Sequence, residues 1–391
     1  MNELPLSGVI VVDLSRALAG PHATMMLGDM GARVIKVEAE GTGDDSRGWG
    51  PPFVGAPEDK ESTYFLSCNR NKESIELNLK DPPDLHLLKA LIARADVLVE
   101  NFRPGVMDRL GLTAAELEAV NPELVILSIT GFGTRGPDSG RAGYDQILQG
   151  EAGLMSITGP DSEHPQKVGV PIGDLLAGIY GAFGVVAGLT RRARTGRGGV
   201  VRTSLLRSLV SSHTFQGTRW TVAGEVPTAL GNQHPSISPY GLFRCADGAV
   251  QISVGNQSLW TSFATEFGID PAQKRFADNG ARVMHRSELI EAIETVFAKV
   301  SRAELLSRLT RIGVPAGQIR SIDEVYEWDQ VLAEGLVIET DHSTLGRIKL
   351  PGASVVFDGC TSPVSQPPPI LGEHNEAIRA WLAVKNEITK I

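Results

Sequence analysis

The chain of 391 residues is poor in cysteine, and its cysteines are widely separated. Cys68, Cys245 and Cys360 are an odd number and form neither a Cys-x-x-Cys pair nor a Cys/His cluster. This spacing argues against a secreted disulfide framework and against a zinc site. We therefore expect a cytoplasmic protein without a bound metal.

Basic clusters and long hydrophobic runs are also missing. The formal net charge is −9, and no block of Lys and Arg is interleaved with aromatic residues, so a nucleic-acid partner is not expected. The first six residues lack the basic start and apolar core of a signal peptide, and the apolar run 175–189 is short and glycine-rich for a membrane span. We expect a soluble chain with no membrane partner, in which local basic residues must bind any anionic ligand.

Two common enzyme motifs are absent or incomplete. No Gly-x-Ser-x-Gly motif occurs, so the nucleophile turn of the serine hydrolases is lacking. The segment Gly131-Phe-Gly-Thr-Arg-Gly136 has the glycine spacing of a dinucleotide site, but Pro137 and Gly140 stand where a helix would have to begin. NAD is therefore not an expected cofactor.

The chain is long enough for two or three domains. Its first two-fifths alternate apolar strand-like runs with helical patterns, which is typical of a mostly parallel α/β sheet. We expect a large Rossmann-like domain over residues 1–220, a linker and a smaller α+β domain over 221–330, and a C-terminal segment over 331–391 that returns to the large domain. Expected strands in the large domain are 8–14, 33–38, 74–79, 97–100, 124–129 and 200–203, with helices at 23–31, 85–95 and 114–120.

Asp174 stands where a long apolar helix is expected to begin. Pro171 and Gly173 disfavour helix before it, and the segment 175–192 carries almost no polar group. Free backbone N–H groups and the helix dipole would favour the ionised carboxylate there, while apolar surroundings would remove its water. These conditions suit a nucleophile. For the residue taken alone, an ordinary N-cap is the simpler interpretation.

Polar and aromatic residues follow the end of an expected strand in the segment 100–105. Asn101, Phe102 and Arg103 offer an amide, an aromatic face and a guanidinium, and Arg109 follows a few residues later. Open α/β sheets bind ligands at the carboxyl ends of their strands, so this group suits a nucleotide-bearing ligand. A polar loop with surface arginines is the commoner alternative for any one such loop.

Taken together, these segments resemble the class III CoA-transferase family, the group of formyl-CoA transferase and carnitine CoA-transferase. The resemblance covers nearly the whole chain. The matching segments are 6–14 with Ala19-Gly-Pro, 30–38, Gly43-Asp-Asp-Ser-Arg47, 69–77, 100–105, 128–133, 153–155, Gly173-Asp, Thr195-Gly-Arg-Gly and 369–374. Within the family, the segments 43–53, 141–145, 157–160 and 231–235 are closer to the succinyl-CoA:glutarate (hydroxymethylglutarate) type.

The resemblance implies a Rossmann-like large domain completed by the C-terminal segment, and a small domain reached by two linkers. Two chains would interlock as a ring-like homodimer, with each active site between domains of different chains. It also implies that Asp174 is the nucleophile, through an aspartyl anhydride and an aspartyl-CoA thioester. CoA and acyl-CoA are then substrates, and no tightly bound cofactor is needed because one thioester is exchanged for another.

Site residues carried over from the family fall on several loops. Those at or near the CoA site are Ala17, Leu18, Ala19, Asn71, Lys72, Asn101, Phe102, Arg103 and Arg109. The glycine loop of formyl-CoA transferases is reduced here to the segment 254–257, so Gly255, Asn256 and Gln257 are candidates for oxyanion and substrate binding, or form a simple turn. Leu18 replaces a glutamine and Ala39 an arginine of formyl-CoA transferases, which argues against formate or oxalate as the substrate.

A dicarboxylic acid, with succinyl-CoA as donor, is expected from the same pattern. Arg16, Arg47 and Arg141 lie in loops that bracket the predicted cleft, where a guanidinium can bind a remote carboxylate bidentately, and Tyr144 is a further candidate contact. Each arginine could instead bind a CoA phosphate or lie on the surface. α-Methylacyl-CoA racemases of the family have histidine in place of Tyr144, and a phenol is a poor general base at neutral pH. A racemase and a non-catalytic CoA-binding module are the alternatives.

Overall fold

The computed structural model describes residues 3–357 and 366–384; Cys360 and two parts of the expected C-terminal segment, 358–365 and 385–391, lie outside the described residues. The chain divides into two compact units. The large unit contains Met1–Leu154, Val168–Thr221 and Asp329–Ile391, and the small unit contains Met155–Lys167 and Val222–Trp328. The divisions near 221 and 329 lie beside the expected boundaries. Residues 155–167, which we expected in the large domain, cluster instead with the small unit.

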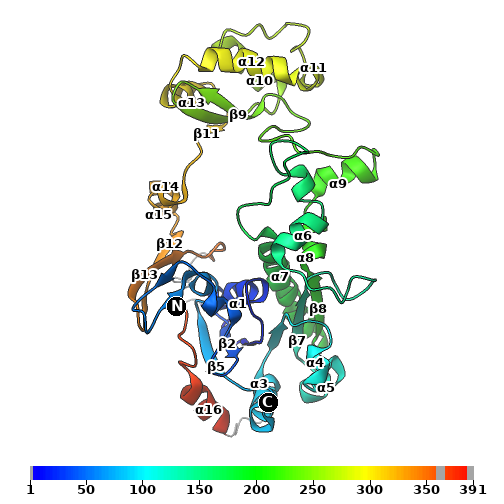
Figure 1. Cartoon of the computed structure of the whole chain (residues 1–391), viewed down its shortest axis with the longest axis vertical. Helices are drawn as coiled ribbons and strands as arrows, with labels where there is room; N and C mark the ends of the chain where they lie inside the picture. The colour runs from blue at the N-terminus through cyan, green and yellow to red at the C-terminus, as the bar shows by residue number, and fades with distance from the viewer. Residues whose placement is uncertain (1–2, 358–365, 385–391) are drawn as a thin grey trace. The chain divides into compact units, whose positions relative to one another are not determined.

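A six-stranded sheet forms the centre of the large unit (Figure 1). Across the sheet, the order is β5 (Lys72–Glu76), β2 (Arg33–Glu38), β1 (Ile10–Asp13), β6 (Val97–Glu100), β7 (Val125–Thr130) and β8 (Gly199–Ser204). Every neighbouring pair is parallel, which confirms the α/β prediction. The strand order reverses between β1 and β6, and this reversal opens the crevice in which such sheets bind ligands.

Helices cover both faces of this sheet. α1 (Ala19–Asp29) and α7 (Ile172–Thr195) contribute to the core on one face, and α3 (Pro82–Arg94), α5 (Ala114–Val120) and α16 (Asn375–Ala383) to the core on the other. Successive side chains of a strand point to opposite faces, so Val11 and Val12 of β1 belong to different cores. Burial of the sheet on both faces explains why its central strands β1, β6 and β7 are mostly apolar in sequence.

The remaining elements of the large unit are short. They are α2 (Thr63–Leu66), α4 (Val106–Arg109), α6 (Asp145–Glu151), α8 (Leu205–Ser211), α9 (Thr214–Thr221), α15 (Asp329–Ala333), the 3-10 helix η1 (Asp45–Gly48), and the hairpins β3 (Phe53–Val54) with β4 (Glu61–Ser62) and β12 (Val337–His342) with β13 (Gly346–Pro351).

The last described segment lies along the free edge of β5. The N–H of Asn71 donates to the carbonyl of Gln366 at 3.0 Å, and the N–H of His374 donates to the carbonyl of Ser74 at 3.0 Å. Ile378 of α16 is fully buried in the core beneath α3. These contacts place the C-terminal segment on the large unit.

Two helices begin earlier than the sequence predicts. α1 begins at Ala19 rather than at residue 23, because Pro21 falls in the first turn, where the missing N–H of proline has no intrahelical partner to lose. α7 begins at Ile172 rather than at Asp174, with Pro171 as its N-cap residue. Asp174 therefore lies within the first turn and not at the cap.

Glycines let α7 pack closely on its neighbours. A Cβ atom on Gly178 would lie 2.7 Å from the carbonyl oxygen of Ala19, and one on Gly181 would lie 2.9 Å from Cδ2 of Leu127. Among the described residues, α7 is the one helix that is long and apolar enough to cross a membrane by length and composition, with 33% of its most apolar window buried. Its contacts with α1 and β7 are those of a helix packed on a sheet.

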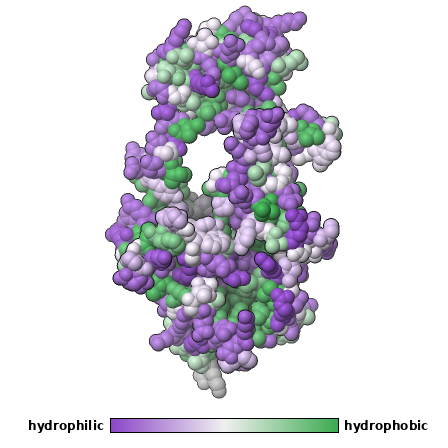
Figure 2. Space-filling view, viewed as in Figure 1, coloured by the Kyte–Doolittle hydropathy of each residue, from purple (hydrophilic) through white to green (hydrophobic). Residues whose placement is uncertain are grey.

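The small unit has a core of its own. It contains an antiparallel sheet in the order β11 (Ala316–Gly317), β10 (Gly248–Ser253) and β9 (Tyr240–Cys245). Its helices are η2 (Met155–Ile157), α10 (Gln257–Glu266), α11 (Asn279–Met284), α12 (Arg286–Phe297), α13 (Arg302–Arg311) and α14 (Ile322–Tyr326). Trp260, Phe263 and Phe297 are fully buried between the sheet and these helices. On the face seen in Figure 2, hydrophobic residues form small patches that hydrophilic residues interrupt.

Candidate active site

Two loops meet where β1 and β6 end. The N–H of Arg16 donates to Oδ1 of Asn101 at 2.9 Å, and Nδ2 of Asn101 donates to the carbonyl of Arg16 at 2.7 Å. The Arg16 guanidinium lies 5.5 Å from the centre of the Phe102 ring. The crevice at the strand-order reversal therefore brings together three of the expected site residues.

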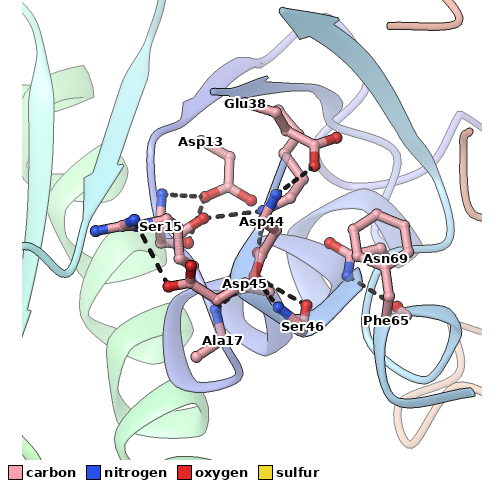
Figure 3. A network of polar contacts seen from close by, with 12 residues as sticks. Asp13, Ser15, Ala17, Glu38, Asp44, Asp45, Ser46, Phe65 and Asn69 are labelled. Atoms are coloured by element: carbon pink, nitrogen blue, oxygen red, sulfur yellow. Dashed lines mark hydrogen bonds and ion pairs between the residues drawn. The ribbon is translucent and has the colours of Figure 1, made fainter. Parts of the chain in front are cut away.

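A buried charge network supports the first of these loops. Nζ of Lys36 donates to Oδ2 of Asp44 at 2.8 Å and to the carbonyl of Ser15 at 2.9 Å, and Oδ1 of Asp44 accepts from the N–H of Ala17 at 3.0 Å. Figure 3 shows Asp13, Ser15, Ala17 and Asp44 gathered in this network. Ala17 has a φ of 69°, a left-handed conformation that costs a non-glycine residue about 1 kcal/mol. The network holds the loop in a shape that its sequence alone would not favour.

Ion pairing determines the protonation state of this network. Burial by itself would raise the pKa of Asp44, but the Lys36 ammonium and two backbone N–H groups lower that pKa to about 2. For Asp13, burial is likewise outweighed by Lys72 and Lys36, so its pKa is also lowered. The pKa of Lys36 is raised against the effect of burial by the charges of Asp44 and Asp13. Both carboxylates are consequently ionised at neutral pH.

Lys72 and Asn71, which the resemblance placed at or near the CoA site, lie in the interior. Nζ of Lys72 donates to Asn69 Oδ1 at 2.8 Å and to the carbonyl of Pro21 at 2.9 Å, and it pairs with Asp13 at 3.2 Å. Burial lowers the pKa of Lys72. Asn71 has a φ of 59° and is also buried. Neither side chain reaches an open surface, because both are used to join the start of β5 to α1 and β1.

Arg47 is bound by a protein carboxylate. Its Nε and Nη2 atoms donate to Glu38 at 2.8 Å and 2.7 Å, its guanidinium lies 3.6 Å from the centre of the Phe65 ring, and only 11% of its side chain is exposed. The bidentate contact that we expected Arg47 to make with a substrate is made with Glu38 instead.

Arg141 and Tyr144 lie on the surface. Arg141 pairs with Glu151 at 2.6 Å and stacks 4.4 Å from the centre of the Phe132 ring. Tyr144 is 64% exposed and directly precedes α6. Of the three arginines expected to bind the substrate, Arg16 is the one at the β1–β6 crevice, where its guanidinium contacts the Phe102 ring and lies 3.6 Å from a carboxylate oxygen of Asp45.

Arg103 and Arg109 are exposed beyond the end of β6, and Arg109 lies in the last turn of α4. Within residues 3–357 and 366–384, neither guanidinium forms an ion pair. Two cations without a protein counter-ion near the crevice are suited to bind phosphate groups.

A small apolar cluster joins this crevice to Asp174. Leu18 is buried against Cys68, Tyr64 and Leu175, and Ala19 is buried at the start of α1. Because Leu175 is the residue after Asp174, the cluster places Asp174 beside the loop that carries Arg16.

Among residues 3–357 and 366–384, no cation shifts the pKa of Asp174. Burial and, to a smaller extent, the negative charge of Asp145 together raise the pKa of Asp174 to about 7. Tyr64 packs with Leu175 in the same cluster, and burial and then the charge of Asp174 raise the pKa of the Tyr64 phenol. Within the described residues, no group donates a hydrogen bond to the Asp174 carboxylate. When ionised, this carboxylate is poorly solvated and more basic than an ordinary aspartate, and both properties favour nucleophilic attack.

The free N–H groups of α7 are capped by Asp145 and not by Asp174. Oδ1 of Asp145 accepts from the N–H of Gly173 at 2.7 Å and from the N–H of Asp174 at 3.4 Å. A Cβ atom on Gly173 would lie 2.9 Å from that oxygen, so glycine is needed for the approach. The interpretation of Asp174 as an ordinary N-cap is therefore wrong, since its side chain makes no capping hydrogen bond.

The segment Gly255 to Gln257 joins β10 to α10 in the small unit. Oδ1 of Asn256 accepts from the N–H of Leu259 at 2.9 Å and caps α10. Gln257 donates to the carbonyl of Ala277 at 2.8 Å, and Gly255 is exposed. These contacts make the segment a helix-capping turn, and a role in binding an oxyanion stays a prediction.

Comparison with known proteins assigns the family. Residues 6–375 match the model of CoA-transferase family III. The chain belongs to this family. It is 41% identical over 376 residues to succinyl-CoA:glutarate CoA-transferase of Mus musculus, covering 96% of this chain and 85% of that protein. It is 39% identical over 384 residues to succinate–glutarate CoA-transferase of Agrobacterium fabrum, covering 97% and 96%.

A solved structure agrees with this assignment. The crystal structure of a CaiB/BaiF family protein from Brucella suis matches the family III chain with a TM-score of 0.86 at 38% identity, covering 97% of this chain and 100% of the other. The prediction of a transferase is thus confirmed, and the alternative of a non-catalytic module is not supported.

Sequence reasoning missed part of the surroundings of Asp174 in this CoA-transferase. Asp145 had been noted only as part of a family motif, and the contribution of Tyr64 was not anticipated. A capping partner 28 residues away leaves no local pattern that would reveal it. A signal was present for Gln149, which stands one helical turn after Asp145, a spacing at which side chains of a helix meet.

Proposed function

We propose that this CoA-transferase uses Asp174 as a covalent nucleophile. The carboxylate attacks the thioester carbonyl of an acyl-CoA and expels CoA thiolate, giving a mixed anhydride. The thiolate then attacks the aspartyl carbonyl, releases the donor acid and leaves an aspartyl-CoA thioester. The acceptor carboxylate attacks this thioester to form a second anhydride, and the returning thiolate takes the new acyl group and frees Asp174.

The surroundings of Asp174 support this proposal more than any other observation. Burial and the charge of Asp145 raise the pKa of Asp174 to about 7, so a substantial fraction is ionised at neutral pH. Its carboxylate oxygens receive no hydrogen bond from the described residues, so none has to be broken before attack. Backbone N–H groups near Gly255 remain candidates for stabilising the oxyanion.

Exposed cations beyond β6 are the proposed site for the CoA phosphates. Arg103 and Arg109 carry no ion pair within the described residues, whereas Lys72 is fully paired in the interior. Arg109→Met should therefore raise the KM for acyl-CoA by about tenfold at low salt, and the effect should weaken as salt is added. Equal KM values for variant and wild type at low salt would remove Arg109 from the site.

A dicarboxylic acid is the proposed acceptor, with succinyl-CoA as donor. The two curated relatives named above are succinate or succinyl-CoA and glutarate transferases. Arg16 lies at the β1–β6 crevice and is held by only one long contact with a carboxylate, so its guanidinium is available to a remote carboxylate.

Paired acceptors test the dicarboxylate proposal. A site that pairs the second carboxylate should reject a monocarboxylic analogue, because the guanidinium would be left unpaired. We expect kcat/KM for glutarate to exceed that for valerate by at least about 100-fold. Equal values for the two acids would remove the dicarboxylate assignment and leave the transferase assignment standing.

An interlocked homodimer is the proposed assembly, on the family resemblance. The face of α7 away from the sheet exposes Ile179, Tyr180 and Phe183, the last with 73% of its surface accessible. A partner chain that covers this face would remove large apolar side chains from water. Sedimentation should show a dimer that persists on dilution, and a reversible monomer at micromolar concentration would contradict interlocking.

Covalent labelling tests the nucleophile directly. After incubation with donor alone and treatment with hydroxylamine or borohydride, mass spectrometry should find a modification on Asp174 and nowhere else. Asp174→Ala should lose transfer while keeping its fold and its affinity for CoA, since the carboxylate is needed only as the acyl acceptor. Transfer that survives in Asp174→Ala would end this mechanism.

A further inference from the structure

Gln149 of α6 is a fully buried amide that uses both ends of its side chain. Its Nε2 donates to Oδ2 of Asp145 at 2.6 Å, and its Oε1 accepts from the N–H of Val168 at 2.9 Å. Val168 is the first residue of the segment that continues into α7. The amide therefore connects α6 to the chain that leads to Asp174.

The connection continues through Asp145 to the first turn of α7. One carboxylate oxygen of Asp145 faces Gln149, and the other accepts from the N–H groups of Gly173 and Asp174. Five residues thus form one line of hydrogen bonds, from the N–H of Val168 to the N–H groups of Gly173 and Asp174. The two fixed backbone ends leave a single arrangement for the two side chains between them.

We propose that Gln149 is a positioning residue, which holds Asp145 against the N-terminal turn of α7 and thereby sets the place and the charge environment of Asp174. This inference rests on the proposed role of Asp174 as nucleophile. Gln149 would act without contacting the substrate. The reactivity of Asp174 would then depend on a neutral amide that lies one helical turn after Asp145.

Only an amide satisfies both neighbours of Gln149. Asp145 needs a donor and Val168 needs an acceptor, and an amide provides both at the end of one side chain. A carboxylate in place of Gln149 would face Asp145 with a second negative charge. An aliphatic side chain would leave the buried end of Asp145 and the Val168 N–H without their partners, which is a costly arrangement in a protein interior.

Few titratable groups lie near Asp174 in the described part of the chain, so the dependence of kcat on pH can be assigned to individual residues. Asp145 of α6 and Tyr64 of α2 face it, and α8 packs there with Leu209. His22 of α1 lies beside Gly178, and burial lowers the pKa of His22 to about 4, so that it stays neutral above pH 5. A change between pH 5 and 8 in the acidic limb, the range in which kcat rises with pH, therefore reports on the ionisation of Asp174.

The first experiment compares Gln149→Leu with a matched control, Asn121→Leu. Asn121 is also a two-ended amide of the large unit, which donates to the carbonyl of Ala95 at 2.8 Å and accepts from the N–H of Glu123 at 3.1 Å, before β7. Gln149→Leu should lower kcat at least tenfold, change the KM for acyl-CoA less than threefold and displace the acidic limb. Asn121→Leu should lower stability but leave kcat and the profile unchanged.

The second experiment exchanges the two groups, with Asp145→Asn and Gln149→Glu combined. In the double variant the new amide still accepts from Gly173 and donates to the new carboxylate, which in turn accepts from Val168. The net charge is conserved and every hydrogen bond is restored, but the carboxylate moves from position 145 to position 149, which is one step further from Asp174 along the line of hydrogen bonds. The double variant should recover kcat to within about threefold of wild type, whereas each single variant loses at least tenfold. Its acidic limb should lie at lower pH than that of wild type.

Two results would overturn the positioning role. One is a Gln149→Leu enzyme with normal kcat and a normal acidic limb, and the other is a double variant no more active than the worse single variant although it melts like wild type. Labelling with donor separates this outcome from failure of the proposed function. If Asp174 is not the nucleophile, wild type itself acquires no modification there.

Discussion

Asp44 and Asp174 of the large unit, the first buried and the second half-buried, differ in the charged groups that face them. Asp44 is fully buried against the ammonium of Lys36, and its pKa falls to about 2. Asp174 faces the carboxylate of Asp145 and the phenol of Tyr64 without a cation, and its pKa rises to about 7. The same kind of side chain is therefore a fixed charge in one place and a group poised to react in the other.

The comparison shows where a carboxylate is removed from water with a compensating cation and where it is not. The Lys36 pair stabilises the loop of Ala17 because both charges are satisfied. At the start of α7 the described residues supply no such cation, so ionisation of Asp174 is unfavourable for the fold and favourable for nucleophilic attack. Reactive sites are commonly less stable than the framework that carries them.

The largest effect is expected on turnover. Asp174→Asn keeps the shape of the side chain but removes the nucleophile, so kcat should fall by more than about 10³-fold. In wild type, kcat/KM should rise with pH as Asp174 ionises, with a midpoint near 7 and a plateau above. Steady-state rates from pH 5 to 9 measure both. An acidic limb near pH 4 would mean that Asp174 behaves as an ordinary carboxylate.

Removal of the cation from the paired network should be the largest effect on stability. Lys36→Met leaves Asp44 and Asp13 buried without the ammonium between them, which should lower the free energy of unfolding by about 3–5 kcal/mol. Denaturant titration measures this loss. The substitution Lys80→Met at an exposed position is a suitable control, and a Lys36→Met variant as stable as this control would show that the pair contributes nothing.

Opposite pH dependences of stability should distinguish the two carboxylates. The folded pKa of Asp174 is raised, so its contribution is fully present below pH ~3.8 and is lost as pH rises through 7. The folded pKa of Asp44 is lowered, so its contribution is present above pH ~3.8 and is lost as pH falls toward 2.

Asp174→Asn should therefore be more stable than wild type at pH 8, by about 2–4 kcal/mol, and nearly equal to it at pH 4. Thermal or denaturant unfolding at the two pH values tests this. A variant that is less stable than wild type at pH 8 would contradict the unfavourable burial of Asp174.

The smallest effect is expected at Ala17. Its left-handed φ of 69° is accessible to glycine without strain, but glycine also has more freedom in the unfolded chain. Ala17→Gly should change the free energy of unfolding by less than about 1 kcal/mol, in the stabilising direction, if the network alone holds the loop. A loss of 2 kcal/mol or more in equilibrium unfolding would show that the Ala17 methyl group packs in a way that matters.

Local patterns were sufficient for much of the fold. The helix 114–120 and the strand 97–100 have the bounds that the sequence predicts, and the capping box of Thr113 and Glu116 is formed. These elements have their signals within a few residues. β9 was not predicted. The residues 231–239 before it are rich in glycine, asparagine, serine and proline, which are typical of turns, and the strand is defined by its pairing with β10.

Charged residues were harder to place, because charge in a sequence suggests exposure. Lys72 and Arg47 were expected to bind ligands, and each is bound by an acidic residue of the protein itself. Asp13, the partner of Lys72, lies on another strand of the sheet, so this pairing depends on strand order, whereas Glu38 and Arg47 pair across the turn that follows β2. Family resemblance supplied Asp174, but the carboxylate that caps its helix became visible only with the tertiary structure.

The C-terminal strap along β5 has a consequence for biosynthesis. The ribosome delivers residues 366–384 after all six strands of the large sheet, and until they emerge β5 is an edge strand with unpaired backbone groups, a form prone to join other chains. All strands of the small unit have been made by residue 317, so that unit can complete its core while the large unit is still waiting. The small unit of a nascent chain should thus complete its folding before the large unit does. Deletion of residues 366–384 should lower solubility by exposing β5, although it removes no residue near Asp174.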